Sequence, residues 1–147
     1  GAIGRALPPQ PAPAPSSGHV RLAVVGAHLS GMPLNAQLTQ RDAVWVEQTV
    51  TAPCYRLYAL ADTDPPKPGL ARAAQGAAIR VELWDIPLAR FGEFVAEIPA
   101  PLGIGTLLLA DGRRVKGFIC EAWALEGATD ITEFGGWRDY LASVKGA

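Results

Sequence analysis

The sequence predicts an α+β domain with a curved, mostly antiparallel sheet or a partly closed barrel, one helix in the middle and a short C-terminal helix. Three observations lead to this prediction. About six segments carry the apolar patterns of strands, two segments carry helix signals, and several strands follow one another through short turns. The 147 residues are 49% apolar and only 18% charged, which suits one domain with its own core.

The first 19 residues are expected to form a disordered linker rather than part of the domain. Proline fixes φ and lacks an amide donor, so the proline-rich stretch 8–15 cannot join a helix or a central strand. A polyproline-like spacer suits a domain that is tethered behind another one. We therefore expect a large domain to precede this chain in the natural protein, and residues 20–147 to form a single domain.

The strands are predicted from their apolar patterns. The first is expected at 21–26, which is continuously apolar after Arg21, as a buried strand is. Further strands are expected at 42–50, 54–60, 78–84, 104–109 and 114–124. The pair Asp111-Gly112 marks a hairpin turn between the last two. The proline-rich segment 62–69 is expected to be a loop.

Two helices are predicted. Pro87 suits the first turn of a helix that continues through Phe91 and Phe94 and ends before Pro99. A capping signal at 129–133 precedes a short helix expected from Trp137 to Val144.

Composition and motifs exclude several classes of function. The net charge of −1 lacks the basic footprint of nucleic-acid binding. Cys54 and Cys120 do not form a CxxC pair, and with two histidines they indicate buried free thiols rather than a metal site. Neither a Walker loop, a GxSxG motif nor a serine–lysine–serine amidase signature occurs, so we expect no cofactor and no amide hydrolysis by that route. Without an 18-residue apolar run or a signal peptide, we expect a cytoplasmic protein that spans no membrane.

His28 is the first candidate for chemistry. It follows a strand directly, in a loop shaped by Gly26 and Gly31. Histidine suits proton transfer near neutral pH, and backbone N–H groups beside glycines can face an anion. The alternative interpretation is an ordinary histidine of a surface loop. The candidate substrate-binding residues of this loop are Gly26, Ala27, Leu29, Ser30 and Gly31.

Four side chains elsewhere are further candidates for substrate binding. Lys67 lies among prolines that hold its loop still, and it is either a pre-placed cation for a carboxylate or a solvated lysine. Glu121 interrupts an apolar strand, on the face of Val115 and Ile119 if alternation continues. It is a core carboxylate with a raised pKa or an ordinary surface acid. Tyr55 and Tyr58 either line one cavity together with these candidate residues or belong to the core and its rim.

Several motifs together resemble the C-terminal domain of allophanate hydrolase. The matching segments are 22–35, 55–58, 65–70, 98–105, 111–121 and 130–137. Each motif alone is weak, but the resemblance extends from about residue 20 to residue 142. It implies a fold like that of gamma-glutamyl cyclotransferases.

The resemblance also implies a function in urea or cyanuric acid breakdown. In that family an amidase domain deaminates allophanate, and the small domain assists decarboxylation of the product, N-carboxycarbamate. The implied partners are thus a small dicarboxylate-like substrate and the amidase domain of the same longer polypeptide. The resemblance then suggests that His28 delivers the proton that decarboxylation requires. This would be a lyase-like step within a hydrolase that acts on linear amides.

Two other functions stay open at this point. The domain could be a non-catalytic module that stabilises or assembles the amidase, since N-carboxycarbamate can lose CO₂ unaided. It could also be a small-anion binder of the cyclotransferase type. Cyclotransferases use a glutamate near the end of the middle helix, where this chain has Ile98 with Glu97 beside it. One residue turns a helical side chain by about 100°, so Glu97 is not an obvious substitute.

Overall fold

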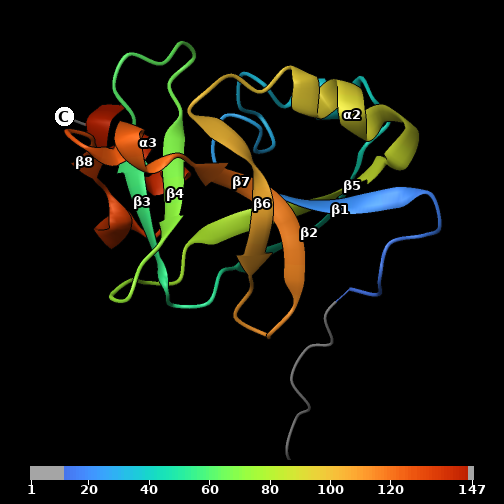
Figure 1. Ribbon diagram of the computed structural model, residues 1–147, viewed down its shortest axis with the longest axis horizontal. Coiled ribbons are helices and arrows are strands. Elements are labelled where there is room, and N and C mark those ends of the chain that lie inside the picture. The colour runs from blue at the N-terminus through green and yellow to red at the C-terminus, as the bar shows by residue number, and fades with distance from the viewer. Residues whose placement is uncertain (1–11, 146–147) are drawn as a thin grey trace, which may run out of the picture.

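The computed structural model describes residues 12–145 and shows a mixed α+β domain (Figure 1). The expected linker at 1–19 lies largely outside the described residues. Among these residues, eight strands form two sheets: β1 (His19–Val24), β2 (Val44–Val50), β3 (Tyr55–Ala59), β4 (Pro68–Arg72), β5 (Arg80–Pro87), β6 (Leu102–Leu108), β7 (Arg114–Cys120) and β8 (Thr129–Asp130). The helices are α1 (Ala36–Thr39), α2 (Leu88–Ala96) and α3 (Trp137–Lys145), with 3₁₀ turns η1 (Ala122–Leu125) and η2 (Thr132–Phe134).

The larger sheet has the strand order β2-β5-β1-β7-β6. Its strand pairs are antiparallel except β1 with β7, which are parallel. The two edge strands approach each other just past their ends, where Thr51 and Leu109 form an isolated antiparallel bridge. The sheet therefore curves toward a partly closed barrel, and the predicted α+β class with a mostly antiparallel sheet is confirmed.

The smaller sheet has the order β4-β3-β8 and packs against the end of the larger one through β4 and β7. In Figure 1 it lies with α3 on the left, while α2 lies across β5 and β1 on the right. The core fills the space between these elements. Its fully buried side chains include Leu22, Leu57, Leu83, Phe94 and Leu107.

Three expectations about the elements were wrong, and two further elements were not predicted. Segment 62–69 is not all loop, because β4 begins at Pro68. The strand expected at 114–124 ends at Cys120 and continues as η1. Helix α1 and strand β8 were not predicted. Pro87 ends β5 and precedes α2 rather than lying in its first turn.

No helix of the described residues has the length and apolar character that a membrane span requires.

Candidate functional site

His28 lies in the loop that follows β1, and it is buried. Only 6% of the residue is exposed. Its ring stacks on Phe118 of β7 at a centroid distance of 4.8 Å, and it meets Phe94 of α2 edge-on at 5.3 Å. The interpretation as an ordinary surface-loop histidine is therefore wrong. A polar ring enclosed by two aromatic rings needs a specific hydrogen bond to offset its burial.

That hydrogen bond comes from α1. The His28 Nε2 atom lies 2.7 Å from Oε1 of Gln37, and Asn35 donates its side-chain N–H to the His28 carbonyl. Burial lowers the pKa of His28 below its ordinary value, and nearby Lys67 lowers it further, although Gln37 and Glu97 act in the opposite direction. Because the net direction is downward, the imidazole is neutral near pH 7 in the empty site.

Lys67 is also buried, with 7% of the residue exposed. Its backbone N–H donates to the hydroxyl of Thr63, and its ammonium group donates to the carbonyl of Pro65 at 3.2 Å. The alternative of a solvated lysine is therefore wrong. A buried ammonium with one neutral carbonyl acceptor retains donors for an anionic ligand.

His28 and Lys67 line the same small hollow, whose volume of about 10 Å³ is that of one water molecule, so a larger ligand would extend from it into solvent. Its other walls are residues 25–27, Pro68, and Leu102 with Phe118. Within the described part of the chain, the N–H groups of Ala27 and His28 have no hydrogen-bond acceptor. The residues that line this hollow thus carry a cation, an imidazole and unpaired backbone N–H groups, which are the types of group that bind a carboxylate.

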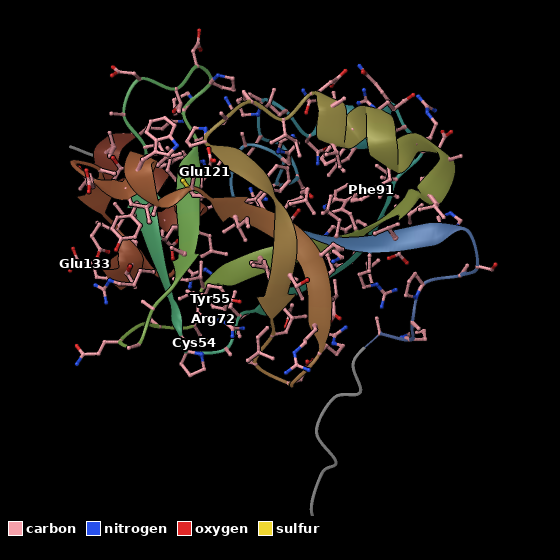
Figure 2. The ribbon with its side chains drawn as sticks, viewed as in Figure 1. Cys54, Tyr55, Arg72, Phe91, Glu121 and Glu133 are labelled. Atoms are coloured by element: carbon pink, nitrogen blue, oxygen red, sulfur yellow. The ribbon has the colours of Figure 1, made fainter. Side chains whose placement is uncertain are left out.

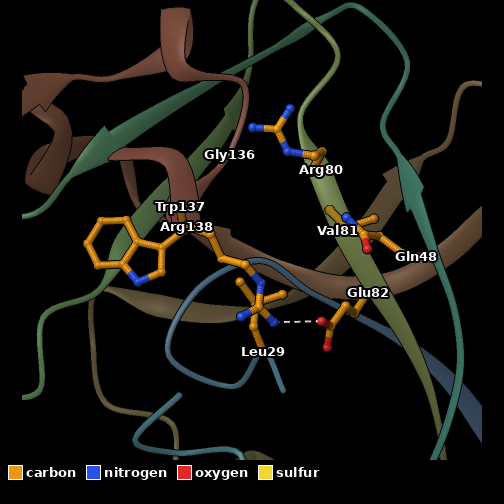
Figure 3. Close-up of a pocket in the computed structure, with 8 residues that line it drawn as sticks. All are labelled: Leu29, Gln48, Arg80, Val81, Glu82, Gly136, Trp137 and Arg138. Atoms are coloured by element: carbon orange, nitrogen blue, oxygen red, sulfur yellow. Dashed lines mark hydrogen bonds and ion pairs between the residues drawn. The ribbon is translucent and has the colours of Figure 1, made fainter. Parts of the chain in front are cut away.

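The far side of the loop is fixed by a buried carboxylate that sequence reasoning missed. Oε1 of Glu82, on β5, accepts hydrogen bonds from Ser30 N–H and Oγ, both at 2.9 Å, and from Trp84 Nε1. Oε2 accepts from Arg138 of α3 at 2.8 Å, and this arginine also donates to the Ser30 carbonyl. Figure 3 shows this ion pair beside Leu29. Burial raises the pKa of Glu82, but the bonds from Ser30, Arg138 and Trp84 outweigh it and lower the pKa overall.

The loop residues therefore divide into two groups. Gly26, Ala27 and His28 line the hollow with Lys67. Leu29 is buried beside Glu82, and Ser30 binds that carboxylate. Gly31 is exposed with a positive φ of 79°, which glycine adopts without strain.

The remaining candidates lie away from the hollow. Tyr55 is 2% exposed, and its hydroxyl accepts the backbone N–H of Leu108, so it belongs to the core. Tyr58 is half-buried on β3 and does not line the hollow. Glu121 follows β7, is exposed and accepts from Trp123 Nε1 at 3.1 Å, so its interpretation as a core carboxylate is wrong. Figure 2 shows Glu121 and Tyr55 well apart.

The end of α2 carries no free glutamate at the hollow. Glu97 accepts a hydrogen bond from Arg41 at 2.7 Å, and Arg41 is itself 9% exposed. Ile98 packs against the core. Neither residue is thus placed as the carboxylate of the cyclotransferase type, in agreement with the sequence argument.

The fold is that of the gamma-glutamyl cyclotransferase-like proteins. A structure of a gamma-glutamyl cyclotransferase superposes on 76% of this chain and 69% of its own with a TM-score of 0.54, at 7% identity. An AIG2-like protein of mouse superposes with a TM-score of 0.51 at 16% identity. At such identities the likeness concerns the fold alone.

The family model for the allophanate hydrolase C-terminal domain matches residues 20–142, and the chain belongs to that family. Urea amidolyase of Lachancea kluyveri is 44% identical over 131 residues, which are 86% of this chain and 7% of that protein. The chain thus spans less than a tenth of the length of that relative. Allophanate hydrolase of Kluyveromyces lactis has a TM-score of 0.82 at 45% identity over 85% of this chain and 21% of its own. A uropathogenic E. coli-specific protein has a TM-score of 0.79 at 37% identity, with 84% and 96% covered.

Proposed function

We propose that this chain acts as the C-terminal domain of a longer enzyme of the allophanate hydrolase type, and that its hollow binds N-carboxycarbamate and assists its decarboxylation. One observation carries the proposal: His28 and Lys67, which come from different loops, line one hollow, and the N–H groups of Ala27 and His28 beside it donate to no acceptor within residues 12–145. The family supports an amidase domain in the same natural polypeptide as the source of this substrate.

The proposed substrate is a dianion with a carboxylate on each side of one nitrogen. Its two negative charges need donors that are already in place, since each donor must otherwise be ordered on binding. The ammonium of Lys67 and the N–H groups of Ala27 and His28 meet that need. A bound dianion beside His28 also raises the pKa of its imidazole, because an opposite charge favours the protonated form.

The proposed step breaks one C–N bond. CO₂ leaves, the electron pair of that bond stays on nitrogen, and the imidazolium of His28 transfers its proton to this nitrogen. The products are CO₂, carbamate and a neutral imidazole, which regains a proton from solvent. Positioned proton transfer of this kind contributes typically about 10²–10⁴-fold to a rate. The rings of Phe94 and Phe118 pack against the imidazole and so limit its contact with water.

The first experiment measures binding of malonate, in which a methylene replaces the nitrogen of the substrate. Calorimetry should show malonate binding to the wild-type chain and much weaker binding of acetate. Lys67→Met removes the charge at similar length and should abolish malonate binding, whereas Lys145→Met, at the end of α3, should not change it. Equal binding of malonate by wild type and Lys67→Met would contradict the assigned site.

The second experiment supplies a separate amidase domain with allophanate and follows CO₂ and ammonia. Release of CO₂ should be faster with this chain than without it, and His28→Ala should remove the acceleration. If the release is the same under all three conditions, the chain is a non-catalytic module that stabilises or assembles the amidase.

A further inference from the structure

The two ring nitrogens of His28 have different surroundings. Nε2 lies 2.7 Å from the amide oxygen of Gln37. An amide oxygen only accepts hydrogen bonds, so this contact is a hydrogen bond when the proton of the neutral imidazole is on Nε2. No described residue forms a hydrogen bond to Nδ1, which therefore carries the free lone pair.

The backbone of Gln37 is held in place by neighbouring residues. It lies on α1, whose Leu38 is fully buried in the core. Arg41 donates to the backbone carbonyl of Gln37 at 2.9 Å, and its other nitrogens bind Glu93 of α2 at 3.0 Å and Glu97, directly after α2, at 2.7 Å. Because Arg41 is itself buried, these bonds tie α1 to the C-terminal part of α2.

We propose that Gln37 is a positioning residue that fixes the Nε2–H tautomer of His28 and thereby makes Nδ1 the atom that exchanges a proton with a ligand in the hollow. This inference rests on the proposed function for the identity of the ligand. Its first half, the tautomer, is independent of that function.

The chemical identity of Gln37 has a consequence for proton transfer. A carboxylate at this position would orient the ring equally well, but it would also stabilise the imidazolium and hold its proton more tightly. A neutral amide orients the ring without that charge. The charged groups near His28 are Lys67 and Glu97, and Glu97 is already paired with Arg41. The imidazole therefore gains its proton chiefly when an anion binds, and it can give that proton up.

The test uses long-range ¹H–¹⁵N NMR of the intact chain, which distinguishes the two tautomers of each histidine. His19 is exposed and serves as an internal reference. The wild type should show His28 as the Nε2–H tautomer. Gln37→Glu should raise the proton affinity of His28 by about tenfold, and Gln37→Met, which has a similar shape but no amide, should lower it. The same substitutions at Gln40, exposed at the end of α1, should leave His28 unchanged.

Opposite shifts distinguish positioning from a merely structural role, because damage to the fold would move both variants in one direction. The inference is overturned if wild-type His28 is the Nδ1–H tautomer, or if Gln37→Glu and Gln37→Met shift its titration alike.

The pH profile of CO₂ release separates this inference from the proposed function. The profile should move up in pH for Gln37→Glu and down for Gln37→Met. If release depends on His28 but neither variant moves the profile, the role of Nδ1 is refuted while the proposed function stands. If the tautomer and titrations are as expected but release does not depend on His28, the proposed function fails while the assignment of Gln37 stands.

Discussion

The ion pair between Glu82 and Arg138 is expected to be strongly asymmetric in its effect on stability. The Glu82 side chain is 7% exposed, whereas that of Arg138 is 43% exposed. Glu82→Ala leaves the N–H of Ser30 and the indole N–H of Trp84 without their acceptor. Each buried donor that loses its partner costs about 1–3 kcal/mol, so we expect a loss of about 3 kcal/mol in the free energy of unfolding.

Arg138→Ala should cost about 1 kcal/mol or less. Its guanidinium is close enough to water for solvation to replace the lost contacts, and Glu82 keeps three hydrogen bonds from Ser30 and Trp84. Urea unfolding followed by far-ultraviolet circular dichroism measures both losses. Glu133→Ala, an exposed acid on η2, is the control and should be neutral. An Arg138→Ala loss equal to or greater than that of Glu82→Ala would refute the reasoning.

The ion pair between Glu82 and Arg138 also makes the free energy of unfolding depend on pH, with a loss at low pH. The pKa of Glu82 is lower in the folded chain than its ordinary value. Its contribution to stability is therefore complete above the unfolded pKa of about 4.3 and is lost as the pH falls through the folded pKa. Below about pH 4 the difference in unfolding free energy between wild type and Glu82→Ala should shrink.

Two further predictions concern the hollow. Gly26→Ala should lower the free energy of unfolding by about 1–3 kcal/mol and weaken malonate binding, because the added Cβ would lie 2.2 Å from Cδ of Pro68. Urea unfolding and calorimetry measure the two effects. An unchanged midpoint of urea unfolding would show that the loop can move away from Pro68. The pKa of His28 is lower in the folded chain than its ordinary value, so the unfolded chain binds a proton more readily at this residue. The contribution of His28 to the free energy of unfolding is therefore fully present above the unfolded pKa of about 6.5 and declines at lower pH. His28→Phe should flatten the urea midpoint between about pH 5 and 7, and an unchanged slope would contradict this.

The elements that were predicted correctly are those whose sequence signal lies within the element or the turn beside it. Asp111-Gly112 marks the turn between β6 and β7, and Gly112 has the positive φ that such a turn needs. Strand β4 was missed for a tertiary reason, because Pro68 and Gly69 are turn residues by every local rule. They pair with Ala59 and Tyr58 of β3 nevertheless, and proline is tolerated at the first position of a strand.

The end of β7 was mispredicted because alternation does not continue. Phe118 and Gly117 are both buried, and Ile119 is exposed. The face of the strand thus changes before Glu121, and η1 begins at the next residue. A pattern of period two cannot reveal such a change, so the sequence could not place Glu121 correctly.

At the candidate site, His28 and Lys67 could be predicted from the sequence, whereas Glu82 and Gln37, which hold the loop and the imidazole in place, could not. His28 and Lys67 stand out by residue type among glycines and prolines. Glu82 lies in a strand that alternates cleanly, where an acid is ordinarily on the water face. Only its contacts with Ser30 and Arg138, 52 and 56 residues away along the chain, show that it is buried. Gln37 lies on a helix of four residues, which is too short to give a periodic signal.

Two side chains, Glu82 and Gln37, thus hold the loop after β1, and they act on different properties of it. Glu82 binds the backbone at Ser30, two residues beyond His28, and so determines where the unpaired N–H groups lie. The side-chain amide of Gln37 contacts the ring of His28, and on the inference above it determines which ring nitrogen carries the proton. Loss of Glu82 should therefore weaken malonate binding at every pH by disordering the donors, whereas Gln37→Met should shift the titration of His28 and weaken malonate binding only where the bound His28 loses its proton. Because one support acts on geometry and the other on protonation, the two effects can be measured separately in the same chain.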